Sequence, residues 1–114
     1  DRVAARAGAD VWGPRMTRPA RVFINGFGRI GRTVFRQIVA AGGKLDLVGI
    51  NDIAPLDTCA YLLRYDSVYG PFPGTVSTGR GWIGVDRRRI AVTQAPDLRA
   101  LDLRDIDVVL DCTG

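Results

Sequence analysis

The chain has 114 residues, of which 46% are hydrophobic and 25% charged, and its formal net charge is +4. This length allows one modest domain and excludes a complete two-domain protein. Basic and acidic residues are interspersed, and the tightest basic cluster, residues 87–89, lies between two strand-like runs. A solvated turn is therefore a better interpretation of this cluster than a nucleic-acid surface, which is kept as a minor alternative.

Cysteine usage and hydropathy restrict the class of protein further. Cys59 and Cys112 lie far apart in apolar segments without CxxC spacing, so neither a disulfide nor a metal site is expected. No apolar run approaches the roughly 18 residues of a membrane span. The first twenty residues lack the apolar core of a secretory signal. We therefore expect a cytoplasmic protein without a metal ion or a membrane contact.

The first half of the chain alternates between strand and helix signals. Residues 1–18 mix small and charged residues without a periodic apolar face, which predicts a disordered N-terminal extension. A β-branched and aromatic run at residues 21–25 predicts a buried parallel strand. Apolar residues at helical spacing predict a helix over residues 29–41, which Gly42 and Gly43 end. Residues 45–50 predict the next strand.

The second half predicts another helix, a ribbon and a last strand. Residues 55–65 carry helical apolar spacing, with a proline and an aspartate in the first turn. Glycines and prolines divide residues 70–93 into short runs typical of an antiparallel β-ribbon. Residues 106–112 predict a parallel strand whose outer apolar edge we expect to be uncovered. Residues 19–114 would then form one α/β domain.

A glycine motif connects the first strand to the first helix. Gly26, Gly28 and Gly31 form GxGxxG, and Asp52 follows the second strand, as in a dinucleotide-binding fingerprint. Gly26 permits a tight turn, Gly28 leaves room for a pyrophosphate, and Gly31 lets the helix approach the strand. The unpaired N–H groups at the helix start favour a diphosphate. The alternative is an ordinary loop of another α/β protein, with Asp52 capping a turn.

This context predicts an incomplete Rossmann-type, doubly wound parallel sheet, with the ribbon of residues 70–93 as an insertion. Asp52 can accept hydrogen bonds from both hydroxyls of the adenosine ribose, and its negative charge would repel a 2′-phosphate. The sequence therefore predicts NAD as the cofactor in preference to NADP.

Residues 24–32 (INGFGRIGR) resemble the phosphate-binding signature of the glyceraldehyde-3-phosphate dehydrogenases. Residues 51–52, 63–67 and 107–114 resemble later landmarks of the same family in the same order, so the resemblance covers about 94 residues. It implies the cofactor-binding part of a glycolytic homotetramer that oxidises glyceraldehyde 3-phosphate with NAD and phosphate. An erythrose-4-phosphate dehydrogenase is the alternative within this group, and the pair Asn51-Asp52 disfavours it.

The resemblance also implies roles for individual residues. The backbone amides of Arg29 and Ile30 would hold the pyrophosphate, and Phe27 belongs to the same cofactor-binding loop. Asp52 would hold the adenosine ribose, and the turn of Thr113 and Gly114 would line the middle of the dinucleotide. One departure is the segment of residues 93–97, which lacks the basic residue that the family usually carries beside the adenine.

The family's nucleophilic cysteine signature and base histidine find no match in this sequence, which contains no histidine. We interpret Cys59 and Cys112 as small core residues and assign no catalytic residue. The catalytic domain is expected to be absent, so the 114-residue chain is predicted to be inactive alone. A second hypothesis is a non-catalytic module that only binds a dinucleotide.

Overall fold

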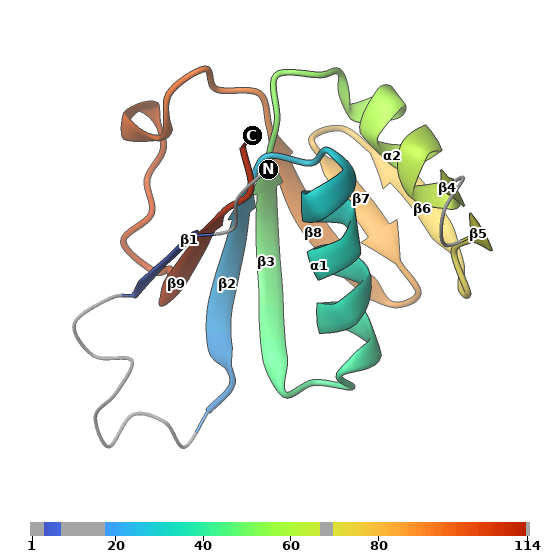
Figure 1. Cartoon of the computed structure of the whole chain (residues 1–114), viewed down its shortest axis with the longest axis horizontal. Helices are drawn as coiled ribbons and strands as arrows, with labels where there is room; N and C mark the ends of the chain where they lie inside the picture. The colour runs from blue at the N-terminus through green and yellow to red at the C-terminus, as the bar shows by residue number, and fades with distance from the viewer. Residues whose placement is uncertain (1–3, 8–17, 67–69, 114) are drawn as a thin grey trace.

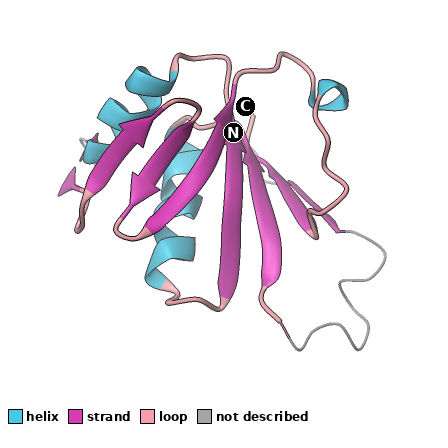
Figure 2. Ribbon diagram, turned by 180° about the vertical axis from the view of Figure 1, so that it is seen from behind, coloured by secondary structure: helices cyan, strands magenta, loops and turns pink. Residues whose placement is uncertain are grey.

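The structure is a computed structural model that describes residues 4–7, 18–66 and 70–113. Its centre is a seven-stranded sheet in the order β1-β9-β2-β3-β8-β7-β6, and β4 and β5 form a small second sheet (Figures 1 and 2). In chain order the elements are β1 (Ala4–Ala7), β2 (Ala20–Asn25), α1 (Arg29–Ala40), β3 (Leu45–Asn51), α2 (Leu56–Arg64), β4 (Tyr65–Asp66), β5 (Gly70–Pro71), β6 (Val76–Gly79), β7 (Trp82–Val85), β8 (Arg88–Thr93), the 3₁₀ turn η2 (Leu98–Ala100) and β9 (Val108–Asp111).

Strands β9, β2, β3 and β8 are neighbours in this order, and all run parallel. Counted along the chain, the parallel strands thus have the order 3-2-1-4 of a Rossmann sheet. This order confirms the predicted partial Rossmann fold. The inner strands β2 and β3 bury most of their apolar residues. Val22, Ile24 and Ile50, for example, expose 2% or less of their surface.

The ribbon predicted over residues 70–93 is present, but it is not a separate insertion. β6 pairs antiparallel with β7, and β7 with β8. β8 also pairs parallel with β3, with Ala91 opposite Gly49. β8 pairs with β7 along one edge and with β3 along the other, while its side chains alternate between a buried face with Ile90 and Val92 and an exposed face with Arg89 and Ala91. The ribbon therefore extends the central sheet.

The expectation of disorder over residues 1–18 is wrong for Ala4–Ala7, which form β1. β1 pairs antiparallel with β9, from Ala4 opposite Asp111 to Ala7 opposite Val108. The outer edge of β9, which the sequence predicted to be uncovered, is therefore covered. Backbone pairing at a sheet edge needs no periodic apolar face, which is why the sequence pattern gave no signal. Residues 1–3 and 8–17 lie outside the described residues.

Both long helices cover one face of the sheet, and the segment that crosses from β8 to β9 follows the other (Figures 1 and 2). The core lies under the helices, where Phe35 of α1 and Leu63 of α2 are fully buried. On the opposite face, Leu101 and Ile106 of the crossing segment line a hollow together with Phe23. This crossing returns the chain over β3 and β2, so the direction of winding reverses between β2 and β9.

Candidate functional site

Two glycines bring β2, α1 and the end of β9 together at backbone distance. Gly26 follows β2 with a φ of +98°, a conformation that glycine adopts readily. A β-carbon at Gly26 would lie 2.8 Å from the backbone nitrogen of Thr113. A β-carbon at Gly31 would overlap the carbonyl oxygen of Gly26. Packing within the chain therefore requires both glycines.

Gly28 differs from its two neighbours in the motif. Its φ is −76°, which any residue adopts, and a β-carbon there would meet no atom within 4 Å. It is the N-cap of α1, and no side chain caps the helix. Arg29 and Ile30 begin the helix, so their N–H groups have no partner within it. No contact within the described residues explains a glycine at this position, which opens onto the positive end of the helix.

Phe27 is held by its N–H group, its carbonyl and its ring. The N–H donates to a carboxylate oxygen of Asp52 at 2.6 Å, and the carbonyl accepts from Nη1 of Arg32 at 3.2 Å. The residue is 2% exposed, and its ring packs edge-on against Phe35, with 5.4 Å between ring centroids. The centre of the glycine loop is therefore fixed, whereas Gly28 beside it faces open space.

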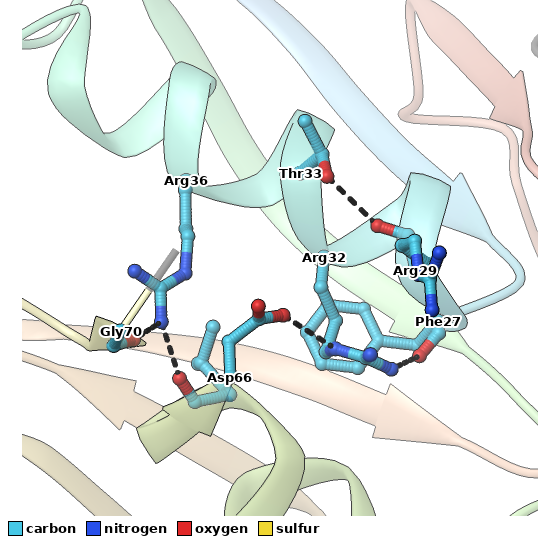
Figure 3. Close-up of polar contacts among 8 residues, drawn as sticks. Phe27, Arg29, Arg32, Thr33, Arg36, Asp66 and Gly70 are labelled. Atoms are coloured by element: carbon cyan, nitrogen blue, oxygen red, sulfur yellow. Dashed lines mark hydrogen bonds and ion pairs between the residues drawn. The ribbon is translucent and has the colours of Figure 1, made fainter. Parts of the chain in front are cut away.

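Two arginines one turn apart on α1 anchor the helix to the neighbouring elements, and both point to the same side (Figure 3). Nε of Arg32 lies 3.4 Å from the carboxylate of Asp66 in β4. Nη2 of Arg36 donates to the carbonyls of Leu63 and Gly70 at 2.8 and 2.9 Å. These contacts connect α1 to the end of α2 and to β5, which fixes the position of the helix that carries the loop.

Asp52 lies directly after β3 and is half-buried. One of its oxygens accepts the N–H of Phe27, and the other accepts the N–H of Ala54 at 2.8 Å. Each carboxylate oxygen has two lone pairs, so both keep acceptor capacity. The loop, Asp52 and the start of α1 thus meet at the carboxyl ends of the parallel strands.

The turn after β9 borders the other side of this site. The backbone N–H and the hydroxyl of Thr113 donate to one carboxylate oxygen of Asp111 at 3.3 and 2.7 Å. This turn places Thr113 beside Gly26. The structure therefore brings together every residue that the sequence predicted for the site, except Gly114, which lies outside the described residues.

The two cysteines are both buried. Burial, together with the nearby charge of Asp52, raises the pKa of Cys59 from 9.0 to about 11. Burial and the charge of Asp111 raise the pKa of Cys112. Both thiols thus stay protonated near neutral pH, which is unsuitable for a nucleophile.

In the described part of the chain, no group of three metal-ligating side chains occurs and no helix is long and apolar enough to cross a membrane.

Sequence reasoning missed three residues that support the loop, namely Asn25, Arg32 and Asn51. Arg32 bonds the loop carbonyl, as described above, and the side chain of Asn51 donates to that of Asn25 at 3.0 Å. The available signal was a polar residue closing an apolar strand, twice in succession, in RVFIN and LVGIN. A buried amide at such a place needs hydrogen-bond partners, which predicts a contact with the neighbouring strand.

Four features define the class of this protein: the strand order, the glycine turn between β2 and α1, the acidic residue after β3, and the reversal of winding between β2 and β9. Ligands of open α/β sheets bind at such a reversal, outside the carboxyl ends of the strands. The chain is therefore a dinucleotide-binding domain of the Rossmann class.

Comparison with known proteins gives the particular family. The family model described as "Glyceraldehyde 3-phosphate dehydrogenase, NAD binding domain" matches residues 20–114, so the chain belongs to this family, and NAD is the cofactor of the domain.

Curated relatives agree with this assignment. The chain is 47% identical over 95 residues to a glyceraldehyde-3-phosphate dehydrogenase of Cereibacter sphaeroides, an alignment that covers 82% of this chain and 28% of the relative. It is 44% identical over 97 residues to the enzyme of Xanthobacter flavus and 45% identical over 96 residues to glyceraldehyde-3-phosphate dehydrogenase 1 of Streptomyces arenae, with 82% of this chain and 29% of each relative covered. The chain thus spans less than a third of the length of these relatives.

The two glycines give opposite expectations for alanine substitution. Helix propensity alone would make Gly31→Ala stabilising by about 0.5–1 kcal/mol. Because the new methyl group overlaps the Gly26 carbonyl, we expect Gly31→Ala to lower the free energy of unfolding by about 1–3 kcal/mol instead. Gly28→Ala should change it by less than about 1 kcal/mol. Urea unfolding measures both, and a stabilised Gly31→Ala variant would contradict the close approach of α1 to β2.

The raised pKa of Cys59 predicts slow thiol chemistry in the folded chain. At pH 8 the shift from 9.0 to about 11 lowers the thiolate fraction about 100-fold relative to the unfolded chain. Alkylation by iodoacetamide of a Cys112→Ala variant should slow by at least this factor on folding. The pKa of Cys59 is higher in the folded chain than in the unfolded chain. The contribution of this thiol to the free energy of unfolding is therefore complete below pH 9 and is lost as the pH rises towards 11. Equal alkylation rates with and without urea would contradict the burial of Cys59.

Proposed function

We propose that this chain binds NAD at the carboxyl ends of β2, β3 and β9. The observation that carries the proposal is Gly28, a glycine that neither its backbone conformation nor its packing against the described residues requires. A pyrophosphate placed against Gly28 would meet the free N–H groups of Arg29 and Ile30 and the positive end of α1. No acidic side chain lies in the first turn of α1 to compete with it.

The adenosine ribose is proposed to lie at Asp52. Both carboxylate oxygens are already oriented by backbone N–H groups, at 2.6 Å from Phe27 and 2.8 Å from Ala54. Their remaining lone pairs can accept the two ribose hydroxyls without rearrangement of the side chain. The negative charge opposes a 2′-phosphate at the same position, which supports a preference for NAD over NADP.

The middle of the dinucleotide is proposed to lie at the turn after β9. Thr113 borders Gly26 there, and its hydroxyl is oriented by Asp111 at 2.7 Å. The residues proposed for the cofactor site are Gly26, Phe27, Gly28, Arg29, Ile30, Gly31, Asp52, Thr113 and Gly114. Gly26, Phe27 and Gly31 act in this site by shaping the loop rather than by contacting the ligand.

A titration with NAD tests this site. We expect the chain to bind NAD, and NADP at least about 10-fold more weakly, because the 2′-phosphate meets the Asp52 carboxylate. Asp52→Asn should weaken NAD binding about 10-fold or more, as expected for hydrogen bonds to a charged acceptor. Gly28→Ala should weaken NAD binding while leaving the fold intact. Isothermal titration calorimetry measures all three, and the exposed Asp57→Asn in the first turn of α2 is the matched control.

Equal affinity of the wild-type chain for NAD and NADP would contradict the assignment of Asp52. Unchanged NAD binding by a folded Gly28→Ala variant would contradict the pyrophosphate position.

For the intact protein we propose the oxidation of glyceraldehyde 3-phosphate with NAD and phosphate, the activity of a glycolytic dehydrogenase that works as a homotetramer. Membership of the family and the names of the relatives support this proposal. The 114 residues would contribute the positioning of the cofactor. Neither Cys59 nor Cys112 suits the role of nucleophile, because both are buried and have raised pKa values.

The purified 114-residue chain is therefore expected to form no NADH from glyceraldehyde 3-phosphate, NAD and phosphate, although it binds NAD. The absorbance of NADH measures turnover, and a relative that spans the full family length provides the positive control. Turnover by this chain that disappears in Cys59→Ala or Cys112→Ala would show that one of its own thiols is the nucleophile, against our assignment.

A further inference from the structure

Polar side chains form one continuous row across the ends of the four parallel strands. Nδ2 of Asn25 in β2 lies 3.4 Å from a carboxylate oxygen of Asp111 in β9. Nδ2 of Asn51 in β3 donates to Oδ1 of Asn25 at 3.0 Å. The hydroxyl of Thr93 in β8 donates to Oδ1 of Asn51 at 2.7 Å. The row Asp111-Asn25-Asn51-Thr93 thus follows the strand order β9-β2-β3-β8 of the sheet.

Asn51 occupies the centre of this row and uses its whole hydrogen-bonding capacity. Besides the bonds to Asn25 and Thr93, its Oδ1 accepts the N–H of Ala95 at 2.8 Å and its Nδ2 donates to the carbonyl of Ala95 at 2.9 Å. A carboxamide has two donors and two acceptor sites, and all four are occupied here. The residue is 3% exposed. If the oxygen and nitrogen of its amide were exchanged, the NH₂ group would face the N–H of Ala95, one donor against another. The amide therefore has one allowed orientation.

The backbone that this amide fixes is the backbone that holds the glycine loop. The carbonyl of Asn51 accepts the N–H of Gly26 at 2.7 Å. The next residue, Asp52, donates its N–H to the carbonyl of Thr93 at 3.0 Å and accepts the N–H of Phe27 on its carboxylate. Movement of the Asn51 peptide would thus displace both the loop and the carboxylate that faces the ribose.

We propose that Asn51 is the positioning residue of the dinucleotide site, and that it sets the preference for NAD over NADP by fixing the carboxylate of Asp52. This inference rests on the proposed binding of NAD at Asp52. Asn51 acts through its neighbours, because its side chain is buried among Asn25, Thr93 and Ala95. The segment that it fixes, residues 93–97, has no basic residue that could hold the adenine end by charge. Recognition of the adenosine half of the cofactor therefore depends more on the position of the Asp52 carboxylate than on a basic residue in this segment.

A matched pair of variants at Thr93 tests the row without opening the core. Thr93→Val keeps the shape of the side chain but removes the hydroxyl that donates to Asn51, whereas Thr93→Ser keeps the hydroxyl. We expect Thr93→Val to weaken NAD binding about threefold to tenfold, the effect of losing one buried hydrogen bond. NADP binding, which gains nothing from the carboxylate, should change much less. The ratio of the NADP and NAD dissociation constants should therefore fall in Thr93→Val and stay unchanged in Thr93→Ser.

Asn51→Leu removes all four hydrogen bonds and should lower this ratio further if the variant folds. Ile38→Val, which removes one methyl group from the core at the far end of α1, is the control for lost stability alone. A role confined to stability would lower the unfolding midpoint of Thr93→Val and of Ile38→Val without changing the ratio in either.

Amide hydrogen exchange in the ligand-free chain gives a second readout. Thr93→Val should accelerate exchange of the Phe27 N–H, which is bonded to Asp52, relative to the Phe72 N–H, which is bonded to the carbonyl of Arg64. Equal acceleration of both amides, or an unchanged ratio of dissociation constants in a Thr93→Val variant that binds NAD, would overturn the proposal. Failure of the wild-type chain to bind NAD would instead refute the proposed function, and the exchange experiment would still decide whether the row positions Asp52.

Discussion

The backbone contact between Gly31 and Gly26 is the constraint on which the rest of this structure depends. Because Gly31 has no β-carbon, α1 can lie directly against the end of β2. The first turn of the helix therefore opens onto the carboxyl edge of the sheet. A helix held farther away would place its first N–H groups farther from Asp52 and Thr113. The short distance between α1 and β2 also lets the Arg32 side chain donate to the carbonyl of Phe27. The helix thus stabilises the glycine loop that precedes it.

Rigidity and openness are divided between adjacent residues of that loop. Phe27 is bonded at both backbone groups and buried through its ring, whereas a β-carbon at Gly28 would meet no described atom within 4 Å. A site for a diphosphate needs both properties, because donors bind strongly only when they are oriented in advance, and they stay available only when the chain does not use them itself. The loop meets both requirements within two residues.

Local signals in the sequence predicted β2, α1, β3 and the glycine loop, because periodicity and glycine spacing depend on residues close together. The parallel pairing of β8 with β3 was not predictable in this way, since alternation in β8 fits a ribbon and a central strand equally well. The supporting contacts lie still farther apart: Arg32 meets Asp66, and Asn51 meets Thr93 and Ala95, more than thirty residues away. β1 pairs with a strand at the opposite end of the chain. Such contacts follow from topology, which a single sequence does not reveal.

The bond between the Phe27 N–H and the Asp52 carboxylate has an evolutionary consequence. If Asp52 selects NAD as we propose, a lineage that came to use a 2′-phosphorylated cofactor would have to remove the negative charge after β3, and the Phe27 N–H would lose its charged acceptor in the same step. A residue without a side-chain acceptor would leave this N–H unpaired and weaken the loop, whereas asparagine would keep a neutral acceptor at the same position. Epistasis of this kind ties the choice of coenzyme to the architecture of the turn, because few residues remove the charge and still hold the loop.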